Sequence, residues 1–184
     1  MVITTVIIIV IALLIVWIIG LYNGLIKLDV RTKEASSDID IQTKRRYDLI
    51  PNLIETVKGI AKQEQTVFTE VTKARTAAMS ATSMADKAGK ENALSNTLKS
   101  LFAVAEAYPD LKSNENFLQL QQELADTENK IEAARRFYNA NVRDFNIKIH
   151  VFPNTIFAER LGFKTDKPLF ESTDAEKENV KVSF

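Results

Sequence analysis

The stretch VITTVIIIVIALLIVWIIGL, Val2 to Leu21, decides how this chain is built. None of its side chains is charged, and the first charged side chain in the sequence is Lys27. At about 1.5 Å per helical residue the stretch is about 30 Å long, which matches the hydrocarbon core of a bilayer. Trp17 and Tyr22 lie near its end, where aromatic side chains favour the headgroup region. The sequence therefore predicts a transmembrane anchor within residues 1–26.

Two other interpretations of this stretch are a cleaved signal peptide and a buried core helix. A signal peptide has a positive segment before its apolar run and small residues at a cleavage site, and neither is seen here. The cationic residues Lys27, Arg31 and Lys33 follow the stretch, whereas none precedes it. Because positively charged flanks stay in the cytoplasm, we expect a single-pass membrane protein whose larger part is cytoplasmic.

After the anchor, apolar residues recur at gaps of three and four, which is the period of an amphipathic helix. Pro51 is expected in the first turn of a helix that Asp48 caps, and Ser113 or Asn114 is expected to cap the last long helix. Antiparallel packing of the apolar stripes predicts an all-α fold, a transmembrane helix followed by a long bundle of about four helices. The predicted bundle helices are residues 25–47, a second helix that starts after Asp48 and has its apolar stripe over residues 53–85, and residues 90–107 and 115–150.

The same pattern divides the chain into three segments. The anchor and juxtamembrane segment covers residues 1–26, the bundle residues 27–162 and an irregular tail residues 163–184. A short helix after Pro153 is expected to stop before Gly162. The tail carries no helical stripe, but its last residues, VKVSF, alternate, which leaves a docked strand as an alternative to an irregular end.

The composition excludes most kinds of chemical site. The chain has no cysteine and one histidine, His150, so thiolate zinc sites, iron–sulfur clusters and paired-histidine metal sites are excluded. Lys plus Arg and Asp plus Glu both number 24, so no basic excess attracts nucleic acid. No glycine-rich phosphate loop or nucleophile elbow is present. We therefore expect no cofactor, no metal, no nucleic-acid partner and no enzymatic activity.

A first group of candidate interaction residues lies in DIDIQTKRRYDLIPNLIE, Asp38 to Glu55. Its charges form either a solvated corner with local ion pairs or a binding site for an anionic headgroup or an acidic partner. In the second case the guanidinium groups of Arg45 and Arg46 would bind the anion. The candidates are Arg45, Arg46, Asp48 and Asn52.

A second group predicts a polar seam between helices. Glu64 falls inside an apolar stripe, where a carboxylate needs a partner. Five polar residues lie within about 20° of the direction of Glu128 on the helical wheel of residues 115–150, namely Gln121, Glu128 itself, Arg135, Asn139 and Asn146. Glu64 and Arg135 are candidate members of this seam. We favour a network that fixes the register of the helices over a catalytic site.

Four blocks of the sequence resemble the LemA family of bacterial membrane proteins. They are the apolar span, DIDIQTKRRYDLIPNLIETVKG, EAYPDLKSNENFLQLQQELADTENKIEAARRFYNANVRDFN and FPNTIFAERLGF. The resemblance implies a single-pass anchor and a long helical bundle, and it does not imply an enzyme, because the family's biochemical role is poorly defined. Family members often have histidine before the glutamate that corresponds to Glu64, whereas this chain has Gln63. The family's recurrent residues fall here on Arg45, Arg46, Asp48, Pro51, Asn52, Leu53, Tyr108, Pro109, Leu111, Asn114, Glu128, Arg135, Tyr138, Asn139, Asn146 and Pro153.

Two functions follow from an anchored bundle without a chemical site. The first is a membrane-tethered scaffold or interaction module of the bacterial cell envelope, which binds membrane lipids through its anchor, associates with itself and contacts other envelope proteins. A tether restricts encounters to a surface, so weak contacts suffice. The alternative is a module that senses anionic lipid or shapes the membrane through its juxtamembrane cations.

Overall fold

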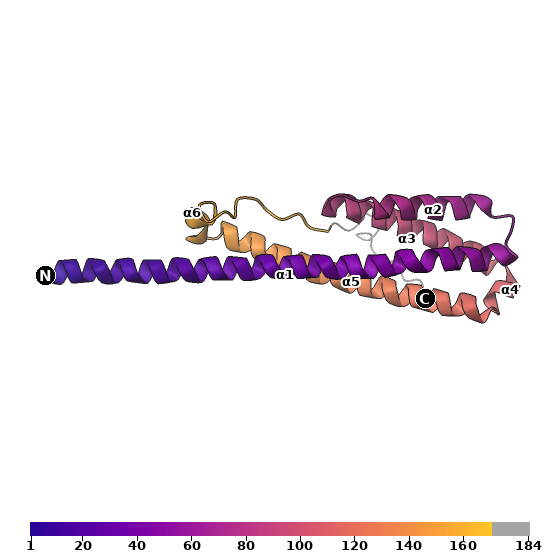
Figure 1. The fold of residues 1–184 in the computed structure, drawn as a ribbon, viewed down its shortest axis with the longest axis horizontal. Helices are drawn as coiled ribbons and strands as arrows, with labels where there is room; N and C mark the ends of the chain where they lie inside the picture. The colour runs from indigo at the N-terminus through magenta and orange to yellow at the C-terminus, as the bar shows by residue number, and fades with distance from the viewer. Residues whose placement is uncertain (171–184) are drawn as a thin grey trace, which may run out of the picture. The chain divides into compact units, whose positions relative to one another are not determined.

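The computed structural model describes residues 1–170, and every regular element in that range is helical (Figure 1). The all-α prediction is therefore confirmed. The helices are α1 (Val2–Ile60), α2 (Gln65–Met79), α3 (Met84–Glu106), α4 (Pro109–Lys112), α5 (Glu115–His150) and α6 (Asn154–Ala158). The apolar stretch forms the first part of α1.

The helix α1 continues through Pro51, so the predicted break at this proline is wrong. A proline has no N–H to donate to the carbonyl four residues earlier, here that of Tyr47. Arg75 of α2 takes the place of that donor, because its Nε lies 2.7 Å from the Tyr47 carbonyl oxygen. The predicted cap Asp48 lies inside α1 and binds Lys44 at 2.7 Å instead.

The next breaks also differ from the predicted ones. The predicted helix over residues 53–85 is interrupted between Ala61 and Glu64, so α2 begins only at Gln65. The helix α3 begins six residues earlier than predicted, at Met84, because the Ser83 side chain accepts a hydrogen bond from the Asp86 backbone N–H. That bond satisfies one of the donors that a helix start leaves free.

The last long helix has the predicted bounds, Glu115–His150, and Asn114 caps it. The Asn114 Oδ1 accepts a hydrogen bond of 3.0 Å from the Phe117 N–H. The segment YPDLKSN, which lies between the predicted helices 90–107 and 115–150, contains the single turn α4. The short helix after Pro153 is present as α6, and the chain then turns at Gly162, whose φ of 94° suits glycine.

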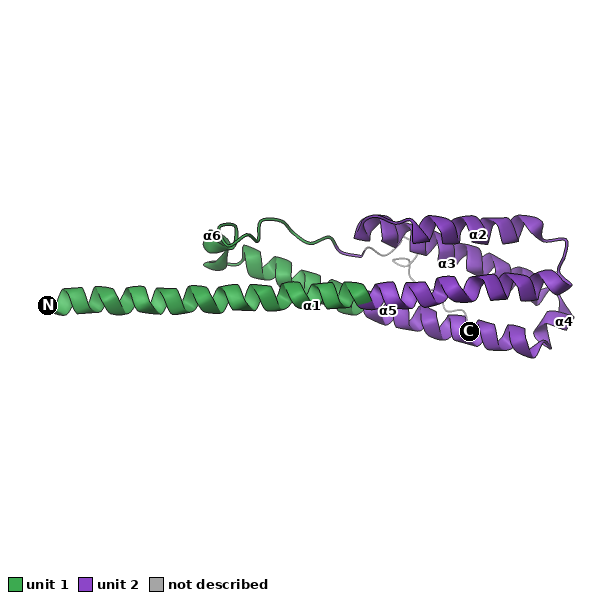
Figure 2. Ribbon diagram, viewed as in Figure 1, with its two compact units in different colours: residues 1–37, 136–168 green, residues 38–135, 169–184 purple. Residues whose placement is uncertain are grey.

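The chain forms two compact units, drawn in different colours in Figure 2. Unit 1 contains residues 1–37 and 136–168, and the described part of unit 2 contains residues 38–135 and 169–170. Both units thus include parts of the segment 27–162, for which one bundle was predicted. The tail is without helix from Phe163 to Phe170, and Phe170 is buried. The alternative of a strand at VKVSF lies outside the described residues.

Each unit has its own apolar core. In unit 2 the core lies among α1, α2, α3, α4 and α5, and includes Leu53, Val57, Val71, Leu94, Leu101, Leu111 and Leu124. In unit 1, α6 and the last turns of α5 pack against α1, and the core consists of Leu21, Leu25, Phe145, Ile149 and Ala158. The apolar residues Phe117, Leu124, Phe145 and Ile149 recur along one face of α5 and are buried, as the helical period predicts, although this period does not predict the division into units.

Candidate functional site

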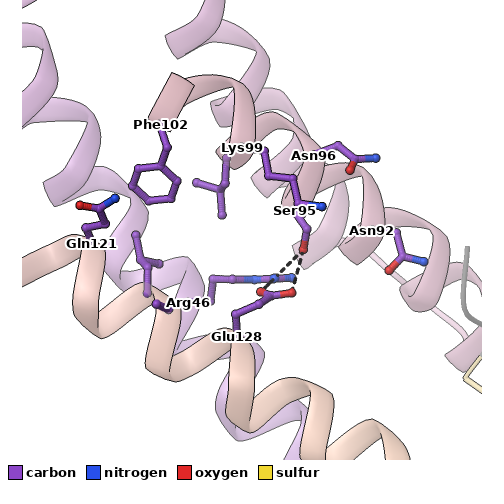
Figure 3. A pocket seen from close by; sticks show the side chains of 11 residues that line it. Arg46, Asn92, Ser95, Asn96, Lys99, Phe102, Gln121 and Glu128 are labelled. Carbon is purple, nitrogen blue, oxygen red and sulfur yellow. Dashed lines mark hydrogen bonds and ion pairs between the residues drawn. The ribbon is translucent and has the colours of Figure 1, made fainter. Parts of the chain in front are cut away.

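The centre of unit 2 holds a buried ionic network around Arg46 of α1 (Figure 3). The Arg46 side chain is 1% exposed, and it forms ion pairs with Glu91 of α3 and Glu128 of α5. Ser95 of α3 closes the network, because it accepts a hydrogen bond of 2.9 Å from Arg46 and donates one of 3.1 Å to Glu128. Three helices are therefore bound together through one guanidinium group.

Burial shifts the proton equilibria of this network. It lowers the pKa of Arg46 from its ordinary value, whereas the neighbouring Glu128 carboxylate opposes that shift. Arg46 nevertheless stays cationic, because an arginine pKa begins far above neutrality. Burial raises the pKa of Tyr47, whose hydroxyl donates a hydrogen bond to Glu91. Arg46 and Tyr47 thus keep the protons with which they donate hydrogen bonds to the carboxylates.

A pocket of about 450 Å³ opens beside the network. Figure 3 shows Arg46, Ser95 and Glu128 meeting in one part of it, while Phe102 and Gln121 lie in another. The volume falls within the range of about 300 to 1,000 Å³ that is usual for ligand pockets. The Glu128 side chain is 45% exposed, so the network reaches the pocket's opening. The remaining lining residues are Asn92, Asn96, Leu98, Lys99, Leu124 and Ala125.

The other candidates at the predicted corner lie outside this network. Arg45 is exposed, and its guanidinium lies 3.8 Å from a Glu123 carboxylate oxygen. Asp48 and Asn52 are exposed on α1. Of the two arginines expected to bind an anion together, Arg46 is therefore bound to carboxylates of its own unit, and only Arg45 faces solvent.

The seam candidates in unit 2 also have separate partners. Glu64 is the residue before α2, and it accepts a hydrogen bond of 3.1 Å from the Tyr108 hydroxyl. This bond is the main cause that raises the Tyr108 pKa. The guanidinium carbon of Arg135 lies 4.5 Å from the centre of the Phe170 ring. The two candidates thus hold different parts of the unit, the entry to α2 and the beginning of the tail.

In unit 1, Asn146 binds the tail through its amide. Its Nδ2 donates to the Lys167 carbonyl at 3.0 Å, and its Oδ1 accepts from the Lys167 N–H at 2.9 Å. Lys167 in turn binds Asp29 of α1 at 2.6 Å, and this bond is the main reason that the pKa of Asp29 is lowered. Asn139 lies half-buried on α5.

Sequence reasoning missed Glu91, Ser95 and Tyr47. A signal for Glu91 was present, because it lies at helical spacing within the buried face of α3, which consists of Ala88, Glu91, Leu94, Leu98, Leu101 and Ala105. A carboxylate in such a stripe needs a cation. Ser95 and Tyr47 carried no comparable signal, because their roles depend on which helices become neighbours.

The apolar half of α1 is the other functional feature. Within the described chain, α1 is the one helix long and apolar enough to cross a membrane, and its most apolar window has no part buried in the structure. An exposed apolar helix continuous with a helical bundle defines a membrane-anchored bundle protein. Residues 35–184 match the LemA family, and this chain belongs to that family.

The alignments with two relatives cover most of this chain. The chain is 26% identical to Protein LemA of Metamycoplasma hominis over 169 residues, which cover 90% of this chain and 75% of that protein. It is 25% identical to magnetosome protein MamQ 2 of Paramagnetospirillum magneticum, with 78% of this chain and 62% of that protein covered. The matched region thus spans less than two thirds of the magnetosome protein. Neither relative's name denotes an enzyme.

Proposed function

We propose that this LemA-family protein is a non-enzymatic, membrane-tethered interaction module that associates with itself. The observation that carries the proposal is the pocket of unit 2, which lies beside an ionic network already neutralised from within the unit. Arg46, Glu91 and Glu128 bind one another, so they stabilise the arrangement of the helices. The pocket presents amides, a lysine and apolar side chains together, a mixture that suits a segment of protein surface.

Because of the membrane anchor, a weak contact at this pocket is sufficient for two copies to associate. Confinement to a membrane raises the effective concentration of neighbouring copies, so association needs little affinity. The pocket also presents the exposed Lys99, and the Glu128 carboxylate, although paired with Arg46, belongs to a side chain that is 45% exposed. A surface that carries both signs can pair with a second copy of itself without net repulsion.

Cysteine crosslinking in reconstituted membranes tests self-association, because the chain has no cysteine of its own. Lys99→Cys places a thiol at the pocket, and Lys73→Cys on α2 is the matched control, since Lys73 is exposed and outside the pocket lining. We expect a crosslinked dimer with Lys99→Cys and little with Lys73→Cys when the lipid-to-protein ratio is high. Monomers alone with both variants would overturn the proposal.

The alternative function, sensing of anionic lipid, is favoured by the residues that follow the apolar stretch. Lys27 and Arg31 are exposed on α1, whereas Lys33 is paired with Asp29 at 2.8 Å. Each exposed juxtamembrane cation contributes about 1 kcal/mol near an anionic leaflet. Under this alternative the crosslinking yield would rise with the fraction of anionic lipid, and Lys27→Gln with Arg31→Gln would abolish the rise. The interaction module alone predicts a yield independent of lipid charge.

The proposal places the bundle in the cytoplasm, since the cations near the anchor follow it and do not precede it. A reporter that is active only outside the cytoplasm, fused after Phe184, is expected to stay inactive in cells. An active reporter would reverse the orientation and leave the association test unaffected.

A further inference from the structure

Unit 1 carries an exposed apolar surface where α5 ends and α6 begins. Phe152 is 80% exposed, Ile156 50% and Val151 44%. These three residues, which we call the α6 tip, lie within six positions of one another in the chain. Exposed side chains of this size are costly in water, and when they cluster they mark a surface that another phase or molecule covers.

The other side of this segment is fixed to α1. The rings of Phe157 and Trp17 meet edge to face with their centres 5.6 Å apart, and those of Phe163 and Tyr22 lie 6.1 Å apart. Ala158 is buried in the same core as Leu21. The height of the α6 tip along α1 is therefore set by contacts with residues 17–25.

Those contacts place the α6 tip at the level where the apolar stretch ends. Trp17 precedes Leu21, the end of the stretch, by four residues, which is about 6 Å of helix, and it precedes Lys27 by ten, about 15 Å. A helix that packs against Trp17 must then lie level with the boundary between acyl chains and headgroups. Interfacial helices bury their apolar faces about 5 to 10 Å into this boundary.

The charged residues that follow the α6 tip in the chain also suit a position at the membrane surface. Exposed cations follow α6 at Arg160 and Lys164, although Glu159 lies 3.9 Å from the Lys164 ammonium and offsets part of that charge. The half-buried Lys148 side chain runs over Gly24, where a Cβ atom would collide with its ammonium group. Apolar tips flanked by long cationic side chains are typical of a segment at a membrane surface.

We propose that the α6 tip is a second membrane contact, inserted into the leaflet from which α1 emerges. Its ligand is lipid: acyl chains against Phe152, Val151 and Ile156, and headgroups near Arg160 and Lys164. This contact rests on the proposed membrane tether. It would fix the rotation and tilt of unit 1 at the surface, because one helix in a bilayer leaves both free whereas two points of contact do not.

Single spin labels on the full-length protein in lipid vesicles test this proposal. Labels are placed by Phe152→Cys, Ile156→Cys and Val151→Cys, all at exposed positions where a label displaces no core side chain. Leu13→Cys within the apolar stretch is the control for hydrocarbon, and Ser37→Cys, exposed on α1 in unit 1, is the control for water. Each label's collisions with oxygen, which concentrates in hydrocarbon, and with a water-soluble nickel chelate are measured.

We expect the three α6-tip labels to collide with the nickel chelate at least about fivefold less often than the label at position 37, since hydrocarbon excludes the chelate. Their oxygen collisions should approach those at position 13. Collisions with the chelate at the rate of position 37 would overturn the proposal. Shielding from both reagents would also overturn it, because a protein surface would then cover the tip. Water access at position 13 would instead refute the membrane tether itself.

Discussion

The substitution Arg75→Met tests why α1 continues through Pro51. The Arg75 Nε lies 2.7 Å from the Tyr47 carbonyl oxygen, the acceptor that Pro51 leaves without a helical partner. Leaving a buried acceptor unsatisfied costs about 1 to 3 kcal/mol. For a chain of this size, a loss of about 2 kcal/mol lowers the melting temperature by about 4 to 8 °C. Thermal unfolding of the full-length protein in detergent micelles, followed by far-UV circular dichroism, measures the change.

The decisive comparison is the same substitution in the background Pro51→Ala. Alanine restores a backbone N–H that can donate to Tyr47, so Arg75→Met should then cost less than about 0.5 kcal/mol. The two changes should therefore couple by about 1 to 2 kcal/mol in a double-mutant cycle. Lys73→Met, at an exposed position of the same helix, controls for the general effect of replacing a cation on α2. An equal cost of Arg75→Met in both backgrounds would refute the explanation.

Three further predictions concern the pH dependence, a cap and the tail. The hydrogen bond from Lys167 holds the pKa of Asp29 below its ordinary 3.8, so the ionised Asp29 stabilises the fold above pH 3.8. This stabilisation is lost as the pH falls below 3.8 and through the lowered pKa. The difference in melting temperature between the wild type and Asp29→Asn should therefore shrink on acidification below pH 3.8. Asn114→Ala should cost about 1 kcal/mol through the lost bond to Phe117 in urea unfolding, and Asn114→Ser should restore it. Phe170→Ala, at a fully buried ring, should cost about 3 to 5 kcal/mol by the same measurement, and a cost below about 1 kcal/mol would show that the ring does not pack there.

The sequence predicted the helices best where local signals and packing agreed. The bounds of α5 follow from a cap at Asn114 and a stripe that the core buries. Pro51 is the opposite case. A proline usually lies in the first turn of a helix, so the sequence around Pro51 indicates a helix start. Here Arg75 of α2 donates to the carbonyl that Pro51 leaves without a donor, and α1 continues. Such an override depends on where Arg75 lies in three dimensions, and no pattern within α1 records that position.

The candidate site was predictable in part for the same reason. Glu128 stands out beside an apolar stripe and Arg46 stands out in a cluster of charges, whereas their meeting at one pocket depends on the arrangement of three helices. Glu91 is the residue that could have been inferred, since it interrupts an apolar stripe and must have a cation. Its partner could not be chosen among the chain's many arginines and lysines without the fold.

The buried network also explains how one bundle can combine a rigid core with an open pocket. Arg46 needs two carboxylates at different depths, Glu91 inside at 2% exposure and Glu128 at the pocket opening. Removing either would leave a buried guanidinium short of a partner, which costs more than a surface pair contributes. The ion pairs of Arg46 with Glu91 and Glu128 therefore hold in register the helices that line the pocket, and one of these carboxylates, Glu128, is also exposed at the pocket. In the proposed self-association, a pocket fixed in this way would bind a neighbouring copy without rearranging, which would lower the entropy cost of each contact at the membrane.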